Sequence, residues 1–179
     1  MPIPIKENSR NPLLNWQLNP FRNWQIDPSR NWQIDPSRNW QIDPSRNWQI
    51  DPSRNWQIDP SRNWQINPSR NWQINPARNW QIDPSRNWQV DPFRATFLKG
   101  NYVTRVRDLS CEYFAVDTPN SNVKIIYNSS GAMVYWAACA NSCWAIYNMS
   151  FRYVGFLCPN INGGYHWFNL SKALMYILS

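Results

Sequence analysis

The octapeptide Asn31-Trp32-Gln33-Ile34-Asp35-Pro36-Ser37-Arg38 is one of ten consecutive copies that fill residues 15–94. The copies follow one another without an insertion or a deletion, so each copy can contact its neighbours in the same way. Ten of the thirteen Trp of the chain occupy one position of this repeat. The unbroken period predicts a stacked array, and it indicates an architecture rather than a reaction.

Substitutions between the copies indicate what each position does. The fourth position is Leu18, then Ile in eight copies, then Val90, which is typical of a buried apolar contact. The fifth position is Asp or Asn, which indicates a side-chain oxygen that accepts hydrogen bonds. Pro always follows, as in a type I turn with Asx at the first corner. The Asn copies are Asn19, Asn67 and Asn75, and the turn is represented by Asp35, Pro36, Asp51 and Pro52.

The segment Asn-Trp-Gln-Ile of each copy is predicted to be a short strand. Period-two alternation places Trp and Ile on one face and Asn and Gln on the other. A Pro at every eighth residue excludes long helices. Two copies would then form one coil of a β-solenoid, and ten copies about five coils spaced about 4.8 Å apart.

Ile needs burial and shares a face with Trp in this scheme, so both are expected in the core of the array. The predicted core residues are Trp24, Ile26, Trp40, Ile42, Trp56, Ile58, Trp72 and Ile74. The candidate exposed ladder is Asn47, Gln49 and Arg54. Stacked Arg residues repel one another unless the Asp three residues earlier offsets their charge, and this compensation weakens at Asn67 and Asn75.

An extended, disordered spacer is the alternative for the array, because polar repeats that contain Pro commonly lack a packed core. The fixed phase of Trp and Ile, and the absence of Gly from the array, favour order. The ends also differ from the interior, since the seventh position is Phe only at Phe21 and Phe93. Terminal copies with a different surface are typical of a stack that needs caps.

Composition changes abruptly after Arg94, which divides the chain into three parts. Residues 1–14 form an N-terminal cap or leader, residues 15–94 the repeats, and residues 95–179 a small second domain. Within that domain a looser unit of strand, Asn/Ser/Gly turn and strand recurs, and each unit predicts a β-hairpin. The units are 127–136, 147–156, 168–177 and a shorter one at 97–106. The predicted fold class is therefore all-β: a solenoid-like array followed by four hairpins.

The hairpin that runs from Tyr147 to Phe156, and Asn-Gly-Gly-Tyr-x-x-Phe at 162–168, resemble the small four-fold β-flower domains of bacterial proteins of unassigned function. Some of these domains follow octapeptide leaders similar to Ile66-Asn67-Pro68-Ser69-Arg70-Asn71. The resemblance covers both halves of the chain. It implies an all-β fold and supplies no catalytic or binding residues.

Charge and targeting signals narrow the range of partners. The net charge is +7, yet Arg and Asp alternate along the array, whereas a nucleic-acid surface clusters its positive charge. Nucleic acid is therefore an unlikely partner. The first residues lack the long apolar core of a signal peptide, and the most apolar run, 132–147, is too short to span a bilayer. We expect no membrane span, and the compartment stays unassigned.

Cys111, Cys139, Cys143 and Cys158 leave three alternatives open. Buried thiols are favoured over disulfides, and both over a metal site, because only His166 can supply a nitrogen ligand and a paired Cys-x-x-Cys is missing. We therefore expect neither a metal nor another cofactor. A single His, few carboxylates in the second half and no nucleophile motif also predict a protein without enzymatic activity.

Two functional classes remain. The first is a structural or assembly protein, in which a rigid rod or fibre-forming array carries a compact β head and copies self-associate. The second is a repetitive surface that binds a glycan, a protein or another regular ligand, or a spacer that carries a binding head. The face that Trp presents discriminates between the classes. Because Ile and Trp share a face in the strand scheme, the pattern favours the structural class.

Overall fold

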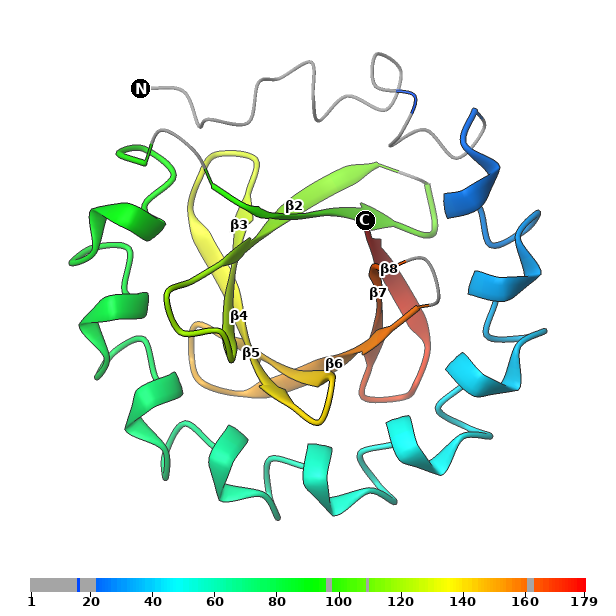
Figure 1. The fold of residues 1–179 in the computed structure, drawn as a ribbon, viewed down its shortest axis with the longest axis horizontal. Helices are drawn as coiled ribbons and strands as arrows, with labels where there is room; N and C mark the ends of the chain where they lie inside the picture. Colours follow the sequence, from blue (N-terminus) through cyan, green and yellow to red (C-terminus); the bar gives the residue numbers. More distant parts are fainter. Residues whose placement is uncertain (1–15, 17–21, 96–97, 109, 161–162) are drawn as a thin grey trace.

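The computed structural model describes residues 16, 22–95, 98–108, 110–160 and 163–179. An antiparallel β-barrel lies at the centre, and the octapeptides follow one another around it in an arc (Figure 1). The predicted all-β class is confirmed in this coarse sense. The predicted cap at residues 1–14, together with Leu18, Asn19 and Phe21, lies outside the described residues.

The barrel has eight strands, each paired with the next along the chain, and β8 pairs with β1 to close it. Each strand therefore has hydrogen-bonded neighbours on both sides, so that no sheet edge is left open. The strands are β1 (Gly100–Arg105), β2 (Cys111–Asp117), β3 (Val123–Asn128), β4 (Met133–Ala140), β5 (Cys143–Asn148), β6 (Tyr153–Pro159), β7 (Tyr165–Asn169) and β8 (Leu174–Leu178).

Three of the predicted hairpin turns fall between consecutive strands, at residues 128–132, 148–152 and 169–173. In each turn an Asn oxygen accepts backbone N–H groups, as when Asn148 accepts from Ser150 and Arg152, at 3.0 Å each. The hairpin predicted at 97–106 is wrong, because the described residues of this segment, 98–106, contain β1 and no second strand. A Cβ at Gly100 would lie 1.8 Å from the carbonyl oxygen of Ala115, so close pairing with β2 explains the glycine there.

The octapeptides form short 3₁₀ turns, so the predicted strands and β-solenoid are wrong. Asn at the start of each copy is extended, and the next three residues turn, with the N–H of the fifth residue bonded to the Trp carbonyl. These bonds are local, so no partner strand is required. The described turns are η2 (Trp24–Ile26), η3 (Trp32–Ile34), η4 (Trp40–Ile42), η5 (Trp48–Ile50), η6 (Trp56–Ile58), η7 (Trp64–Ile66), η8 (Trp72–Ile74), η9 (Trp80–Ile82) and η10 (Trp88–Val90).

The 3₁₀ turn separates Trp from Ile. With three residues per turn, successive side chains point about 120° apart, whereas a strand would place the first and third on one face. The predicted core residues Ile42, Ile58 and Ile74 are buried, and the side chain of Ile26 lies outside the described part of the structure. The other half of the prediction is wrong: the Trp side chains are 53–57% exposed, including the predicted core residues Trp24, Trp40, Trp56 and Trp72.

The aliphatic residues of the array pack on the outside of the barrel. Ile66, Ile74 and Ile82 share one apolar cluster with Val123, Trp136 and Tyr147 of the barrel. Ile58 shares a second cluster with Phe156 and Phe168, and Val90 a third with Phe114 and Ile125. The array and the barrel therefore share a core, and the array curves around the barrel instead of extending from it.

Two barrel tyrosines set the register between the array and the barrel. The hydroxyl of Tyr127 donates to the carbonyl of Val90, and that of Tyr147 to the carbonyl of Ile66. The two tyrosines occupy equivalent places in consecutive hairpins, and their acceptors lie three octapeptides apart. Each barrel hairpin therefore corresponds to three octapeptides, which run round the barrel in the opposite sense.

Candidate functional site

The turn after each 3₁₀ segment has the predicted Asx-Pro geometry. The carboxylate of Asp35 accepts from the N–H and the hydroxyl of Ser37, at 2.9 and 2.6 Å, and its carbonyl accepts from Arg38 N–H at 3.0 Å. Pro36 lies at the second corner, where its fixed φ is favourable. Asp51 and Pro52 have the same arrangement, with Ser53 in place of Ser37.

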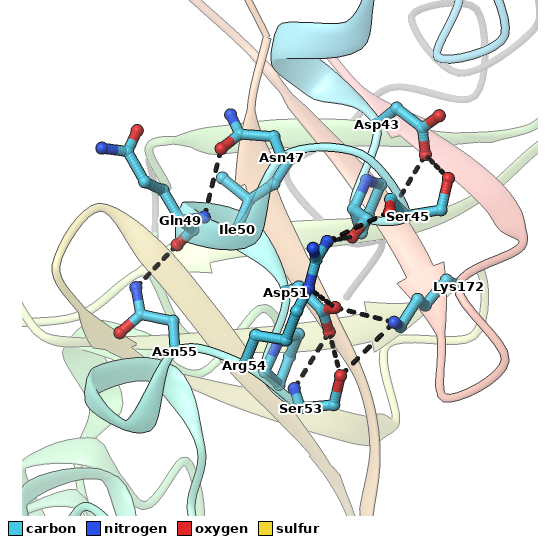
Figure 2. Close-up of polar contacts among 12 residues, drawn as sticks. Asp43, Ser45, Asn47, Gln49, Ile50, Asp51, Ser53, Arg54, Asn55 and Lys172 are labelled. Atoms are coloured by element: carbon cyan, nitrogen blue, oxygen red, sulfur yellow. Dashed lines mark hydrogen bonds and ion pairs between the residues drawn. The ribbon is translucent and has the colours of Figure 1, made fainter.

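From Arg38 onward, each Arg that follows an Asp connects its own copy to the preceding one. Arg54 Nε lies 2.7 Å from Asp51 Oδ2, and Arg54 Nη2 donates to the carbonyl oxygens of Pro44 and Ser45 at 3.0 and 3.1 Å (Figure 2). The same Asp–Arg pair occurs in all seven described octapeptides whose fifth residue is Asp. The side chain of the predicted ladder residue Arg54 is about half exposed, but its guanidinium is already bonded to Asp51 and to these two carbonyl oxygens.

Asn at the first position makes a second connection between copies. The side-chain oxygen of Asn47 accepts from Gln49 N–H at 3.1 Å (Figure 2). The side-chain amide of Asn47 donates to the carbonyl of Gln41 at 2.7 Å. Asn55 donates in turn to the carbonyl of Gln49 at 2.7 Å. Most of these Asn side chains are buried, and Asn47 is half-buried. Of the predicted exposed ladder, only the side chain of Gln49 faces solvent without one of these bonds.

Trp is the large side chain of each copy that stays exposed to solvent. The ten repeat indoles have almost equal exposed fractions, from 53 to 57%. They are Trp16, Trp24, Trp32, Trp40, Trp48, Trp56, Trp64, Trp72, Trp80 and Trp88, and we call this set the Trp belt. Neighbouring Gln side chains are mostly exposed too. The belt therefore combines apolar ring faces with hydrogen-bonding groups at a regular spacing.

The pKa is lowered for six Asp side chains of the turns, namely Asp27, Asp35, Asp43, Asp51, Asp59 and Asp83. Burial alone would raise the pKa of Asp35, but hydrogen bonds from Ser37 and Arg38 outweigh it and lower the pKa. Asp51 is fully buried, and burial opposes its ionisation as well. Hydrogen bonds from Lys172, Ser53 and Arg54 nevertheless lower its pKa to about 2. Lys172 lies on the barrel, 2.7 Å from Asp51, so this ion pair ties the array to the barrel.

A cavity of about 320 Å³ lies between the array and the barrel, around two octapeptides with Asn at the fifth position. Its lining includes Asn67 and Asn75 from the array and Tyr147, Phe151 and Tyr153 from the barrel. The cavity could not be predicted from the sequence, because its existence depends on which hairpin turn faces which octapeptide. The two Asn substitutions were its only signal in the sequence.

Cys143, Cys158 and His166 of the barrel are buried, and Cys111 and Cys139 are half-buried. The Sγ atoms of Cys143 and Cys158 lie 3.2 Å apart in the interior, and all four cysteines are thiols. Burial lowers the pKa of His166 to about 4, so this residue is neutral at physiological pH. Among the described residues, no three His, Cys, Asp or Glu side chains are grouped to hold a metal ion.

Comparison with protein-family models, with curated proteins and with solved structures finds no significant match to the chain. The resemblance to β-flower domains therefore stays a prediction. None of the helices in the described part of the chain has the length and apolar character needed to cross a membrane. Function has to be argued from the geometry of the array.

Proposed function

We propose that the protein is a non-enzymatic binding protein whose Trp belt is a repetitive surface for a regular ligand, with a glycan as the ligand class. The observation that carries the proposal is the exposure of every repeat indole, at 53–57%. The sequence pattern favours a structural role only if Trp lies in the core, and the repeat Trp side chains are exposed instead.

The fold does not account for Trp at this position. In the octapeptides that share an apolar cluster with the barrel, Ile or Val supplies the contact, Asn bonds to the preceding copy, and Arg does so where the fifth residue is Asp. An exposed indole contributes little to these contacts and leaves apolar surface in water. Large exposed apolar surfaces of this kind typically mark binding sites.

The chemistry of the Trp belt fits a sugar polymer. An indole face can stack on the apolar face of a sugar ring, while its N–H and nearby Gln amides can bond to hydroxyl groups. Because the copies are nearly identical, a ligand with regular units can contact several of them at once. Multiple contacts increase the overall affinity without requiring any single strong contact.

Self-assembly is the second candidate function, supported by the same surface. A second copy of the chain could cover the exposed indoles, as in the assembly role that the repeats suggested. Glycan binding and self-assembly both depend on Trp, but they differ in what the purified protein does alone. The oligomeric state in the absence of a ligand therefore separates them.

The test uses the full chain with a panel of insoluble polysaccharides, namely cellulose, chitin, xylan and peptidoglycan. We expect the wild type to be retained on at least one, and the triple variant Trp32→Ala, Trp40→Ala, Trp48→Ala to be released. A matched control, Ser29→Ala, Ser37→Ala, Ser45→Ala, changes an exposed position in three consecutive copies of the same region of the array. Ala77 shows that this position accepts Ala.

Sedimentation velocity without a ligand completes the experiment. A wild type that is monomeric and retained, with a Trp variant that is monomeric and not retained, supports glycan binding. Oligomers that dissociate in the Trp variant would instead support self-assembly. Equal retention of the wild type and the Trp variant, or no retention on any polysaccharide, would refute the glycan proposal.

A further inference from the structure

Two arginines in consecutive octapeptides differ from the described repeat arginines that are paired with an Asp. Arg70 and Arg78 belong to octapeptides with Asn67 and Asn75 in place of Asp. Within the residues that the structure describes, neither guanidinium has a carboxylate or carbonyl partner, and both side chains are exposed. Two neighbouring positive charges therefore face solvent without compensation.

Replacement of Asp by Asn removes the carboxylate and engages the Pro carbonyl to which the other arginines bond. In the other copies the Arg bonds to the Asp and to a Pro carbonyl of the preceding copy, as Arg62 does with Asp59 and Pro52. In the Asn copies the Asn amide itself donates to that Pro carbonyl. Asn67 bonds to Pro60 and Asn75 to Pro68, each at 3.1 Å. In the Asp copies the same Arg nitrogen also reaches the next carbonyl, as Arg62 does at Ser53. The equivalent carbonyls for Arg70 and Arg78 belong to Pro60, Ser61, Pro68 and Ser69, which line the cavity described above.

The same Asn and Pro residues line the cavity of about 320 Å³ described above. The barrel side of this cavity is aromatic, formed by Tyr147, Phe151 and Tyr153. The hydroxyl of Tyr147 is bonded to the carbonyl of Ile66. The hydroxyl of Tyr153 is buried and has no hydrogen-bond partner among the described residues.

The hairpin turn at 169–173 is in direct contact with the array, and its comparison with the turn at 148–152 explains the cavity. In the turns 128–132, 148–152 and 169–173, one residue has positive φ and donates its N–H to the Asn at the start of the turn. These residues are Gly131, Phe151 and Lys172. Lys172 reaches Asp51 of the array and neutralises it. Phe151 faces neutral Asn residues instead, and a cavity remains.

We propose that this cavity binds a small ligand with one six-membered ring and one acidic group, either a carboxylate or a phosphate. The ring would lie against Phe151 and Tyr153, and the acidic group would face Arg70 and Arg78. This site is separate from the Trp belt and does not depend on its function.

Each part of the ligand follows from a feature of the cavity. A volume of about 320 Å³ accommodates a single ring with its substituents but not a chain of rings. Guanidinium groups bind carboxylates and phosphates through paired, charge-assisted hydrogen bonds. Asn instead of Asp at positions 67 and 75 also removes the negative charge that would repel an acid.

Calorimetric titration of the full chain at low salt tests the proposal with benzoate, phenyl phosphate and glucuronate as ring acids, and inorganic phosphate as an acid without a ring. We expect saturable binding of at least one ring acid, with an affinity higher than that of inorganic phosphate. Comparison of benzoate with glucuronate distinguishes an aromatic acid from an acidic sugar.

Two variants assign the binding to this cavity. Asn67→Asp with Asn75→Asp recreates the Asp–Arg pairs of the other copies, so it should fold and should weaken binding at least tenfold. Phe151→Gly introduces the residue of the equivalent turn and should weaken binding of the ring acids but not of inorganic phosphate. Arg46→Gln, which alters an arginine already paired with Asp43, is the matched control and should bind like the wild type.

Three results would overturn the proposal. One is the absence of saturable binding of every ring acid to the wild type. Another is an unchanged affinity in the double Asp variant, which would place the acid elsewhere. The third is an equal loss of affinity in Arg46→Gln, which would indicate a general charge effect of the array.

Discussion

Replacement of Ile66 by Ala tests how the array is held on the barrel. Ile66 is 1% exposed and belongs to the apolar cluster that includes Trp136 and Tyr147 of the barrel. Its carbonyl also accepts the hydroxyl of Tyr147, so the residue lies where the two parts of the chain meet. We expect the substitution to destabilise the protein strongly.

The size of the effect follows from the carbon atoms that are removed. Ile→Ala deletes three carbons, at about 0.8 kcal/mol for each buried methylene, and the cavity left behind adds to this cost. The free energy of unfolding should fall by about 3 kcal/mol. For a chain of 179 residues this corresponds to a decrease of about 10 °C in Tm.

Thermal and urea unfolding followed by circular dichroism measures this difference. Trp64→Ala is the matched control, because it removes a larger side chain two residues away that is 56% exposed. We expect the control to change the free energy of unfolding by no more than about 0.5 kcal/mol. If Trp64→Ala is as destabilising as Ile66→Ala, the assignment of inner and outer faces is wrong. If neither has an effect, the array does not pack on the barrel.

Three further predictions concern polar contacts. The pKa of Asp51 is about 2 in the folded chain against 3.8 for an unperturbed Asp, so its stabilisation, about 2 kcal/mol, is present above pH 4 and lost as pH falls toward 2. Asp51→Asn should reduce the change of the urea-unfolding free energy across that range by about 2 kcal/mol, and an unchanged pH dependence would contradict this role. Asn63→Ala removes the bonds to Gln65 N–H and to the Gln57 carbonyl, and it should cost about 1–2 kcal/mol in the same assay; no loss would show that these bonds are dispensable. Tyr147→Phe should cost about 1 kcal/mol and accelerate hydrogen exchange near Ile66, whereas unchanged exchange would argue against the bond between them.

The local features of the array could be predicted from the sequence. The aliphatic fourth position is buried, and the Asx-Pro-Ser-Arg segment turns with Asp as the acceptor, because both properties depend on residues within one copy. The position of Trp could not be predicted in the same way. Asn-Trp-Gln-Ile satisfies the period of a strand and that of a 3₁₀ turn equally well, and only the second places Trp opposite the core.

The surface against which the array packs was harder to predict from the sequence. A repeat of identical copies suggests that the copies pack against one another, whereas the Ile residues from Ile50 to Ile82 pack on a barrel that lies later in the chain. Nothing within an octapeptide indicates such a partner. The ion pair between Lys172 and Asp51 could not be predicted from the sequence either, because the two residues lie 121 positions apart. The unequal copies with Asn67 and Asn75 were visible, but their meaning required the facing turn at Phe151.

Nuclear Overhauser effects from the Ile methyl groups test the central claim most directly. The claim is that the octapeptides surround the barrel with Ile inside and Trp outside. In the full chain with labelled Ile methyls, assigned through Ile66→Leu, we predict contacts from Ile66 to the rings of Trp136 and Tyr147. Contacts from Ile66 only to indoles of neighbouring octapeptides would indicate a solenoid, and an absence of long-range contacts would indicate a disordered spacer. Either result would contradict the account.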